Sequence, residues 1–397
     1  MKILVTTLGK GRRDENGYRV AKYRFADGTT SRETPFFGLA LMDYLAEHGH
    51  GLDKVVVLGT TGSIWDAWWQ ASEKMLENKA ELFHRLGEMV ENAERNEELL
   101  AELSKALSES FGKTFECKFI PSGITGDEQK EILQVINSVG EKGDTVHLDV
   151  THGFRHLPML EMMSAFLMKS NYSIGGLFYG AFENKDADDI TPVVSLTGLL
   201  NLQEWVEAMA VLRETGNVMP LARIEGMKPF RADLERYQFY SQMNNVAQAR
   251  SVARSMISRL GELPPEGTLF RGQLADMFSW AEDQRYARRQ FRQARAAYES
   301  GDYLRMTIML MESVISANVG LGNERNADVR RQTQETLNGT YDEQWHILRK
   351  LRNSFAHDGE PTGRGAATVI RMRTDKIAFD EAMHGIMQWV EEQMNRI

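Results

Sequence analysis

The sequence contains a single cysteine, Cys117, among its 397 residues. One thiol cannot form an internal disulfide framework or a metal cage built only from thiolates, so the chain suits a reducing compartment. No stretch approaches the roughly 20 uninterrupted apolar residues that a membrane-spanning helix needs. Residues 1–5 lack the long apolar run and the small-residue cleavage site of a signal peptide, and they indicate a strand. We therefore expect a cytoplasmic protein without a membrane segment.

The chain also lacks an excess of positive charge, because its formal net charge is -9. This value argues against a dedicated, non-specific nucleic-acid binder, which is usually basic overall. It still allows a local basic patch that contacts nucleic acid. With 42% hydrophobic and 26% charged residues, the chain is an ordinary globular protein, and its length predicts two or three domains.

Two common nucleotide-binding motifs are missing as well. No Gly-Lys-Ser/Thr follows a glycine-rich loop, and no Gly-x-Gly-x-x-Gly occurs at a predicted strand–helix turn. The sequence also offers no tight cluster of His, Asp and Glu with metal-ligand spacing. We therefore expect neither a metal nor a dinucleotide cofactor.

The first half of the chain alternates short apolar runs with helical patterns. Predicted strands cover residues 2–7, 54–58, 116–120, 145–150, 173–182 and 192–196, and predicted helices cover 35–47, 127–139 and the segment from 157 onward. Residues 9–33 are predicted to be a long polar loop, and residues 65–111 a helical hairpin inserted in the sheet domain. Such alternation is typical of right-handed βαβ crossovers in a mainly parallel, doubly wound sheet.

After Thr197 the strand patterns stop and only helical periodicity remains. The predicted helices cover residues 199–213, 230–259, 267–281, 285–300, 303–319, 341–357 and 375–394. The fold class is thus α/β followed by all-α, with a domain of residues 1–200 and a second of residues 201–397.

Small and polar residues follow several of the predicted strands. They are Thr7, Leu8 and Gly9 after the first strand, Gly59, Thr60, Thr61, Gly62 and Ser63 after the second, Thr151, His152 and Gly153 after the fourth, and Tyr179 in the fifth. The ends of parallel strands share one edge of the sheet, where ligands of such folds bind. Hydroxyl groups, glycine N–H groups and nearby Arg155 suit a phosphate-bearing ligand. Taken one at a time, each loop is equally explained as a tight turn.

The string Asp149-Val150-Thr151-His152-Gly153 matches the Asp-x-Thr-His-Gly signature of a family of CRISPR-associated proteins, and residues 58–65 and 178–181 resemble the same family. The resemblance implies a CRISPR-associated Rossmann-fold (CARF) sensor domain over residues 1–200. Such domains dimerise and bind cyclic oligoadenylates made by type III CRISPR effector complexes. The implied ligand is an allosteric activator, with cyclic tetra-adenylate favoured and the hexa-adenylate as its main rival.

A second motif lies at the end of a predicted helix, where Arg352, Asn353 and His357 follow one another closely. One explanation is a helix C-terminus, at which cationic side chains complement the dipole and Gly359 ends the helix. The other is the Arg-x4-His motif that it resembles, that of HEPN ribonucleases, with Asn353 at the polar second position. That resemblance implies that all three residues are catalytic and that RNA is the substrate.

The chemistry of these residue types fits RNA cleavage by the 2′-OH, which would give a 2′,3′-cyclic phosphate. Histidine transfers protons near neutrality, and arginine binds phosphate oxygens without losing its charge. Positions 352 and 357 lie about 140° apart on a straight helix. One pair therefore encloses a site poorly, whereas two pairs in a two-fold dimer can converge.

These patterns predict a homodimeric endoribonuclease of antiviral defence, controlled by a cyclic oligoadenylate. Two alternatives stay open: a non-enzymatic cyclic-nucleotide-binding regulator, and a sensor that also cleaves its own activator through Thr151 and His152. One further feature is a helix with five arginines between Arg285 and Arg295, interleaved with aromatic residues. Two interpretations are open for this helix: a solvated helix face, or a surface that guides RNA.

Overall fold

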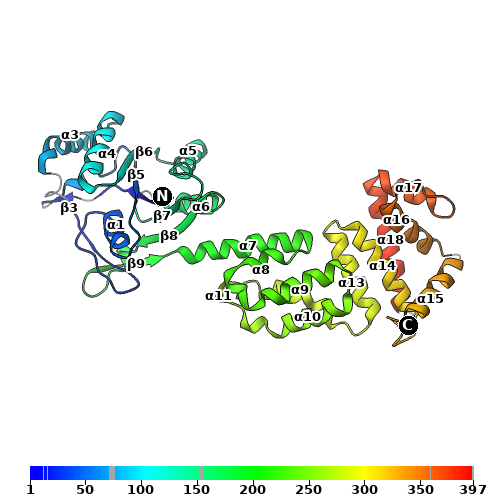
Figure 1. Cartoon of the computed structure of the whole chain (residues 1–397). Helices are drawn as coiled ribbons and strands as arrows, with labels where there is room; N and C mark the ends of the chain where they lie inside the picture. The colour runs from blue at the N-terminus through cyan, green and yellow to red at the C-terminus, as the bar shows by residue number, and fades with distance from the viewer. Residues whose placement is uncertain are drawn as a thin grey trace. The chain divides into compact units, whose positions relative to one another are not determined.

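The computed structural model describes residues 1–395 apart from 12, 16, 71–76, 153–155, 341 and 358. The chain divides into two compact units, Met1–Asn201 and Leu202–Ile397 (Figure 1). The first contains the sheet, and the described part of the second is helical. Among the described residues, no helix is both long and apolar enough to cross a membrane.

A seven-stranded sheet with the order β4-β9-β8-β7-β1-β5-β6 forms the centre of the first unit. Its strands are β1 (Lys2–Leu8), β4 (Lys22–Arg24), β5 (Lys54–Gly59), β6 (Thr114–Phe119), β7 (Thr145–Asp149), β8 (Ser173–Gly180) and β9 (Ile190–Ser195). All neighbouring pairs are parallel except β8 and β9. The predicted mainly parallel, doubly wound sheet is confirmed.

Helices cover both faces of this sheet, because successive residues of a buried strand point to opposite sides. Leu4 of β1 packs in one core with α1 (Phe37–Glu47), α3 (Ala80–Glu91) and α4 (Glu97–Phe111). The adjacent Val5 packs in another core with α5 (Gly126–Asn137) and α6 (Leu157–Met168). The result is a three-layer arrangement in which the strand ends remain between the helical layers.

Two segments of this unit differ from the sequence prediction. Residues 9–33 are not a plain loop, since they contain the two-stranded pair β2 (Arg13–Asp14) and β3 (Gly17–Tyr18) and the edge strand β4. Strands of two or three residues are too short to show an alternating pattern. Residues 65–111 are not helical throughout, because α3 ends at Glu91 and α4 begins only after Asn96, whose side chain accepts a hydrogen bond from Leu99 N at 3.0 Å.

The second unit contains a succession of helices around one core. They are α7 (Thr197–Thr215, which begins in the first unit), α8 (Met219–Arg223), α9 (Arg231–Gln242), α10 (Val246–Ser258), α11 (Pro265–Thr268), α12 (Arg271–Phe278), α13 (Tyr286–Glu299), α14 (Tyr303–Asn318), α15 (Ala327–Gly339), α16 (Glu343–Ala356), α17 (Ala366–Thr374) and α18 (Lys376–Asn395).

The helical prediction holds for most of this unit, with three helices missed and two patterns divided, since residues 267–281 comprise the end of α11, all of α12 and a 3-10 turn. The missed helices are α8, α15 and α17. The pattern over residues 230–259 is two helices, since Asn244 takes a left-handed conformation (φ 53°) and Asn245 caps α10 through its side chain. Asparagine is among the few residues that adopt this conformation readily, which is why the chain turns there.

Candidate functional site

The strand ends of the first unit are held together by a buried hydrogen-bond network centred on Asp149. Thr6 Oγ1 donates to Asp149 Oδ2 at 2.6 Å, and Thr151 N donates to Asp149 Oδ1 at 2.9 Å. Asp149 is 1% exposed, and this burial raises the pKa of its carboxyl group, against the opposing effect of nearby His152. Gly180 N in turn donates to Thr151 Oγ1 at 2.8 Å. The network thus joins the ends of β1, β7 and β8 into one edge.

His152 is fixed from two directions. Its backbone oxygen accepts a hydrogen bond from Thr7 Oγ1 at 2.6 Å, and its Nε2 accepts one from Phe37 N, at the start of α1, at 2.8 Å. Burial lowers the pKa of the imidazole, with the carboxylate of Asp149 acting in the opposite direction. A ring whose Nε2 accepts from a backbone N–H is neutral, so His152 positions the first turn of α1 beside the strand ends.

The loop after β5 is held in a similar way, through Ser63. Its hydroxyl donates to Leu8 O at 2.6 Å and accepts from Thr60 N at 2.9 Å. The Trp65 indole donates to Thr60 O at 2.9 Å, and a Cβ on Gly59 would lie 2.7 Å from the Trp65 ring. Glycine at position 59 is therefore required by close packing, whereas a Cβ on Gly62 would meet nothing within 4 Å.

The sequence-predicted site residues of this edge fall into two groups by burial. Thr7, Leu8, Gly59 and Ser63 are buried, while Gly9, Thr60, Thr61, Gly62, Thr151, His152 and Tyr179 are partly exposed. Gly153 and Arg155 lie outside the described residues. The structure thus brings loops from β1, β5 and β7 to one edge, with a buried layer that holds them and a partly exposed rim.

One buried group at this edge has no counterpart in the sequence prediction. Glu161 of α6 is 2% exposed, and neither carboxylate oxygen has a hydrogen-bond partner among the described residues. Burial, together with the charge of Asp149, raises the pKa of its carboxyl group well above the ordinary value, against a smaller opposing effect of the nearby Thr7 hydroxyl. A glutamate on the apolar stripe formed by Leu157, Ala165 and Met168 is the sequence signal that indicates it.

The second predicted site lies at the C-terminal end of α16. The helix begins at Asp342, whose side chain accepts from Gln344 N and Trp345 N, and it buries Trp345, Leu348 and Leu351. The alternate face carries Arg352 and Asn353, both exposed, with Arg352 Nη1 donating to Asn353 Oδ1 at 3.1 Å.

His357 is the residue at which α16 ends. It is exposed and has an extended backbone (φ -138°, ψ 130°), and its N–H donates to Asn353 O at 3.1 Å. The Arg352, Asn353 and His357 side chains therefore share the solvent-facing end of one helix. His346, three turns earlier on a similar face of the helix, is 9% exposed, and its Nε2 lies 2.9 Å from Thr340 O, which indicates a packing role.

The described ranges contain no group of three His, Cys, Asp or Glu side chains arranged to hold a metal ion. The arginine-rich helix is α13, and its cations do not share one environment. Arg289 is 7% exposed and donates to the carbonyl oxygens of Asp283 and Gln284, whereas Arg292 and Arg295 are exposed. The reading of α13 as one solvated face is therefore wrong for Arg289, because the helix is packed on two sides.

The sequence was compared with known families and proteins. Residues 3–183 match the family described as CRISPR system endoribonuclease Csx1, CARF domain. The chain is 24% identical over 402 residues to the CRISPR-associated protein MJ1674 of Methanocaldococcus jannaschii, an alignment covering 90% of this chain and 62% of that protein's length. Among solved structures, Enterococcus italicus Csm6 bound to cyclic hexa-2'-fluoro-hexa-dAMP gives a TM-score of 0.42 at 10% identity, over 99% of this chain and 94% of that one.

Proposed function

We propose that the chain is an RNA endonuclease controlled by a cyclic oligoadenylate, from the premise that residues 3–183, which match the Csx1 CARF-domain family, form such a domain. The observation that carries the proposal is the edge at which loops from three parallel strands meet. Its rim offers hydroxyl groups, glycine N–H groups and the Tyr179 ring to a ligand, over a layer of side chains already hydrogen-bonded to one another.

The proposed activator is cyclic tetra-adenylate, bound by the rim residues defined above. In this proposal the buried residues hold the loops and the rim residues contact the ligand. Backbone N–H groups and hydroxyls bind phosphate oxygens, and an aromatic ring such as that of Tyr179 packs against a base. Thr7 and Ser63 then support the ligand site indirectly by fixing the loop backbone, because their hydroxyl groups donate to His152 O and Leu8 O.

The proposed assembly is a homodimer. Met159, Met163 and Leu167 lie four residues apart along α6, so they share one helix face. They are 65%, 48% and 53% exposed, an unusual amount for large apolar side chains in such an array. A second copy of the same face would cover them with two-fold symmetry. A cyclic activator with internal symmetry suits a site formed by two copies of one edge.

The proposed cleavage chemistry uses Arg352, Asn353 and His357 in the helical unit. His357 transfers a proton to or from the reacting oxygens, while the Arg352 guanidinium stabilises charge on the phosphorane. Asn353, through the 3.1 Å contact, orients the guanidinium. The Arg352, Asn353 and His357 side chains are exposed at the end of α16, so one copy alone leaves them open to water. Two copies brought together by the dimer supply the enclosed groove, and activator binding changes their arrangement.

The proposal is tested by measuring cleavage of a labelled single-stranded RNA with cyclic tri-, tetra- and hexa-adenylate side by side. We expect cleavage by the native chain with one ring size and none by the His357→Ala variant. Cleavage by the variant at the native rate would overturn the assignment of His357. Binding of the ring without any RNA cleavage by the native chain would favour the non-enzymatic regulator.

Destruction of the activator by the CARF domain itself is the weaker alternative. His152 would have to act as a base, yet its Nε2 accepts the Phe37 N–H at 2.8 Å and is therefore committed. Incubation of labelled cyclic tetra-adenylate with the His357→Ala variant tests this alternative. We expect no linear product.

A further inference from the structure

A cavity of about 750 Å³ lies within the helical unit, among α7, α9, α12, α13 and α14. Its volume falls in the range of pockets that hold small organic ligands. Six charged side chains line it: Arg213, Arg292, Arg295, Arg305, Asp276 and Glu299. Because the arginines outnumber the carboxylates by two, the cavity favours an anionic ligand.

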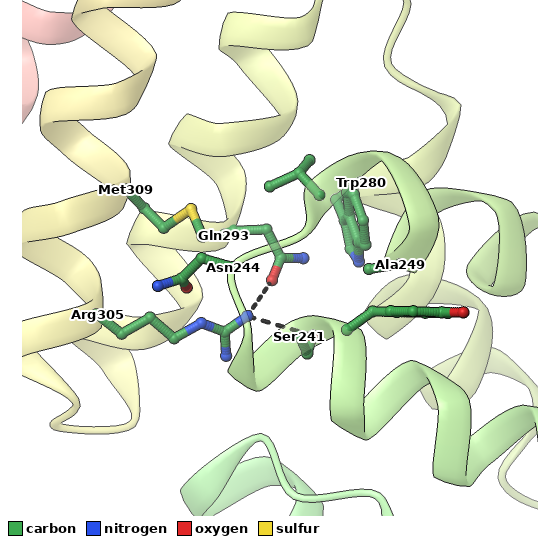
Figure 2. A pocket seen from close by; sticks show the side chains of 9 residues that line it. Ser241, Asn244, Ala249, Trp280, Gln293, Arg305 and Met309 are labelled. Atoms are coloured by element: carbon green, nitrogen blue, oxygen red, sulfur yellow. Dashed lines mark hydrogen bonds between the residues drawn. The ribbon is translucent and has the colours of Figure 1, made fainter. Parts of the chain in front are cut away.

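Arg305 is partly buried, whereas Arg292 and Arg295 of the same cavity are exposed. Its Nη2 donates to Gln293 Oε1 at 2.8 Å and to Ser241 Oγ at 3.3 Å, as Figure 2 shows. Both acceptors are neutral and buried, no ion pair of Arg305 is found among the described residues, and its Nε has no hydrogen-bond partner there. A half-buried guanidinium held only by neutral acceptors is costly unless an anion completes its surroundings.

Two further polar atoms beside Arg305 lack partners within the described part of the chain. The Trp280 side chain is 4% exposed and its indole N–H finds no acceptor, and Asn244 Oδ1 is a buried acceptor without a donor. Both side chains line a narrow recess that is too tight to hold a water molecule, and it shares Ser241, Trp280, Gln293 and Arg305 with the larger cavity (Figure 2). Of the two, only Trp280 also lines the larger cavity, so its indole N–H is the donor that lies beside a ligand bound there.

The remaining walls add a second positive group and apolar surface. Arg295 has no hydrogen-bond or ion-pair partner among the described residues, whereas Arg292 lies 3.5 Å from Asp283 and Arg213 lies 3.1 Å from Glu214. Tyr237, Met209 and Leu212 contribute aromatic and aliphatic surface to the same cavity. The cavity therefore combines Arg295 and Arg305, neither of which pairs with a carboxylate among the described residues, with the Trp280 donor and apolar walls.

We propose that this cavity binds a nucleoside phosphate, either as a free nucleotide or as one nucleotide of an RNA strand. Arg305 and Arg295 face the phosphate, and the aromatic and aliphatic wall packs against the sugar and base. The indole N–H of Trp280 can donate to one of the acceptor groups that every base carries. The inference does not rest on the proposed nuclease activity, since it concerns binding by residues distant in sequence from Arg352 and His357.

Binding is measured by calorimetry with uridine 5′-monophosphate, a short oligouridylate RNA and inorganic phosphate. The protein carries His357→Ala so that RNA stays intact, and uridine nucleotides are chosen because adenine nucleotides also suit the proposed sensor edge. We expect Arg305→Gln to weaken binding by roughly tenfold or more, the loss typical of one charge-assisted contact. The matched control is Arg331→Gln on α15, a 71% exposed arginine, which we expect to change binding by less than about twofold.

Arg295→Gln provides a second variant at an exposed position, should Arg305→Gln impair folding. Binding of the monophosphate supports a free nucleotide as the ligand, and binding of the RNA alone supports a strand as its source. The inference is overturned if neither binds, if inorganic phosphate binds as tightly as the nucleotide, or if both variants bind like the unsubstituted cavity. The measurement involves neither RNA cleavage nor an activator. A negative result would therefore overturn this inference without bearing on the proposed nuclease activity.

Discussion

The strand-end edge of the first unit and the end of α16 in the second differ in how completely one chain builds them. At the edge, the hydroxyl and imidazole groups of Thr6, Thr151 and His152 already have partners inside the same unit. At the end of α16, the Arg352 and Asn353 side chains are exposed, and the hydrogen bond found for them within the described residues joins one to the other at 3.1 Å. The first region is preorganised for a ligand, whereas the second needs another surface to exclude water. The function proposed above would use this difference, with ligand binding at the preorganised edge changing how two copies of the α16 end are arranged.

Replacing His357 by alanine gives the largest expected effect, and it tests the catalytic role proposed for the end of α16. We expect RNA cleavage to fall by roughly 10²–10⁴-fold, the contribution typical of a positioned proton-transfer group. Stability should not change, because His357 is exposed. Cleavage is followed with labelled RNA at saturating activator, and His84→Ala, at a 71% exposed position of the first unit, is the control. Equal loss in both variants would contradict the assignment.

Two glycines of one loop test how rigidly the edge is built. In Gly59→Ala the new Cβ would lie 2.7 Å from the Trp65 ring and 2.9 Å from Ser63 Cβ. We expect a loss of about 1–3 kcal/mol in the free energy of unfolding, as for other overpacked sites. Gly62→Ala, with open space around its Cβ, should stay within about 0.5 kcal/mol. Urea unfolding measures both, and equal values for the two variants would show that the loop is not tightly packed.

Lowering the pH should weaken the first unit through His147 of β7. Burial, aided by the charges of His50 and Lys2, lowers the pKa of this imidazole to about 4, and neither ring nitrogen has a partner among the described residues. Between about pH 6.5 and pH 4 the unfolded chain binds a proton that the folded chain refuses, so stability falls as the pH falls and is unaffected above that window.

The expected loss between pH 7 and pH 5 is about 1–2 kcal/mol in the free energy of unfolding. Urea unfolding at the two pH values measures it, with His147→Gln as the control that should lose most of this difference. An unchanged pH dependence in the variant would assign the effect to another group, such as His152, whose pKa burial also lowers.

The smallest expected effect sharpens the contrast at α16. Asn353→Ala removes the exposed 3.1 Å contact with Arg352 and should change the free energy of unfolding by less than about 0.5 kcal/mol. Removing the corresponding partner at the edge, in Thr6→Val, should cost about 1–3 kcal/mol, because Asp149 then loses a buried donor. Chemical unfolding of both variants provides the measurement, and a large loss for Asn353→Ala would mean that α16 is more rigidly built than described.

The order of strands and helices followed from sequence pattern wherever elements were long. β1, β5 and β7 were predicted because their apolar runs are buried on both faces, and α16 because its apolar residues recur with helical spacing. The edge strand β4 was not predicted, since three residues carry no period. The division of residues 230–259 was missed because Asn244, rather than glycine or proline, makes the turn.

The sequence by itself determined the sheet, the family signature and which loops meet at one edge, because parallel strands that follow one another must end on the same side. Only the tertiary structure decided which of those residues hold the edge and which remain for a ligand. Burial of Asp149, the hydrogen bond from Phe37 N to His152 and the burial of Glu161 depend on neighbours far apart in the chain. The cavity around Arg305 was likewise decided by the tertiary structure. The residues that line it lie between positions 209 and 305, mostly on five helices, so no motif in the sequence indicates it.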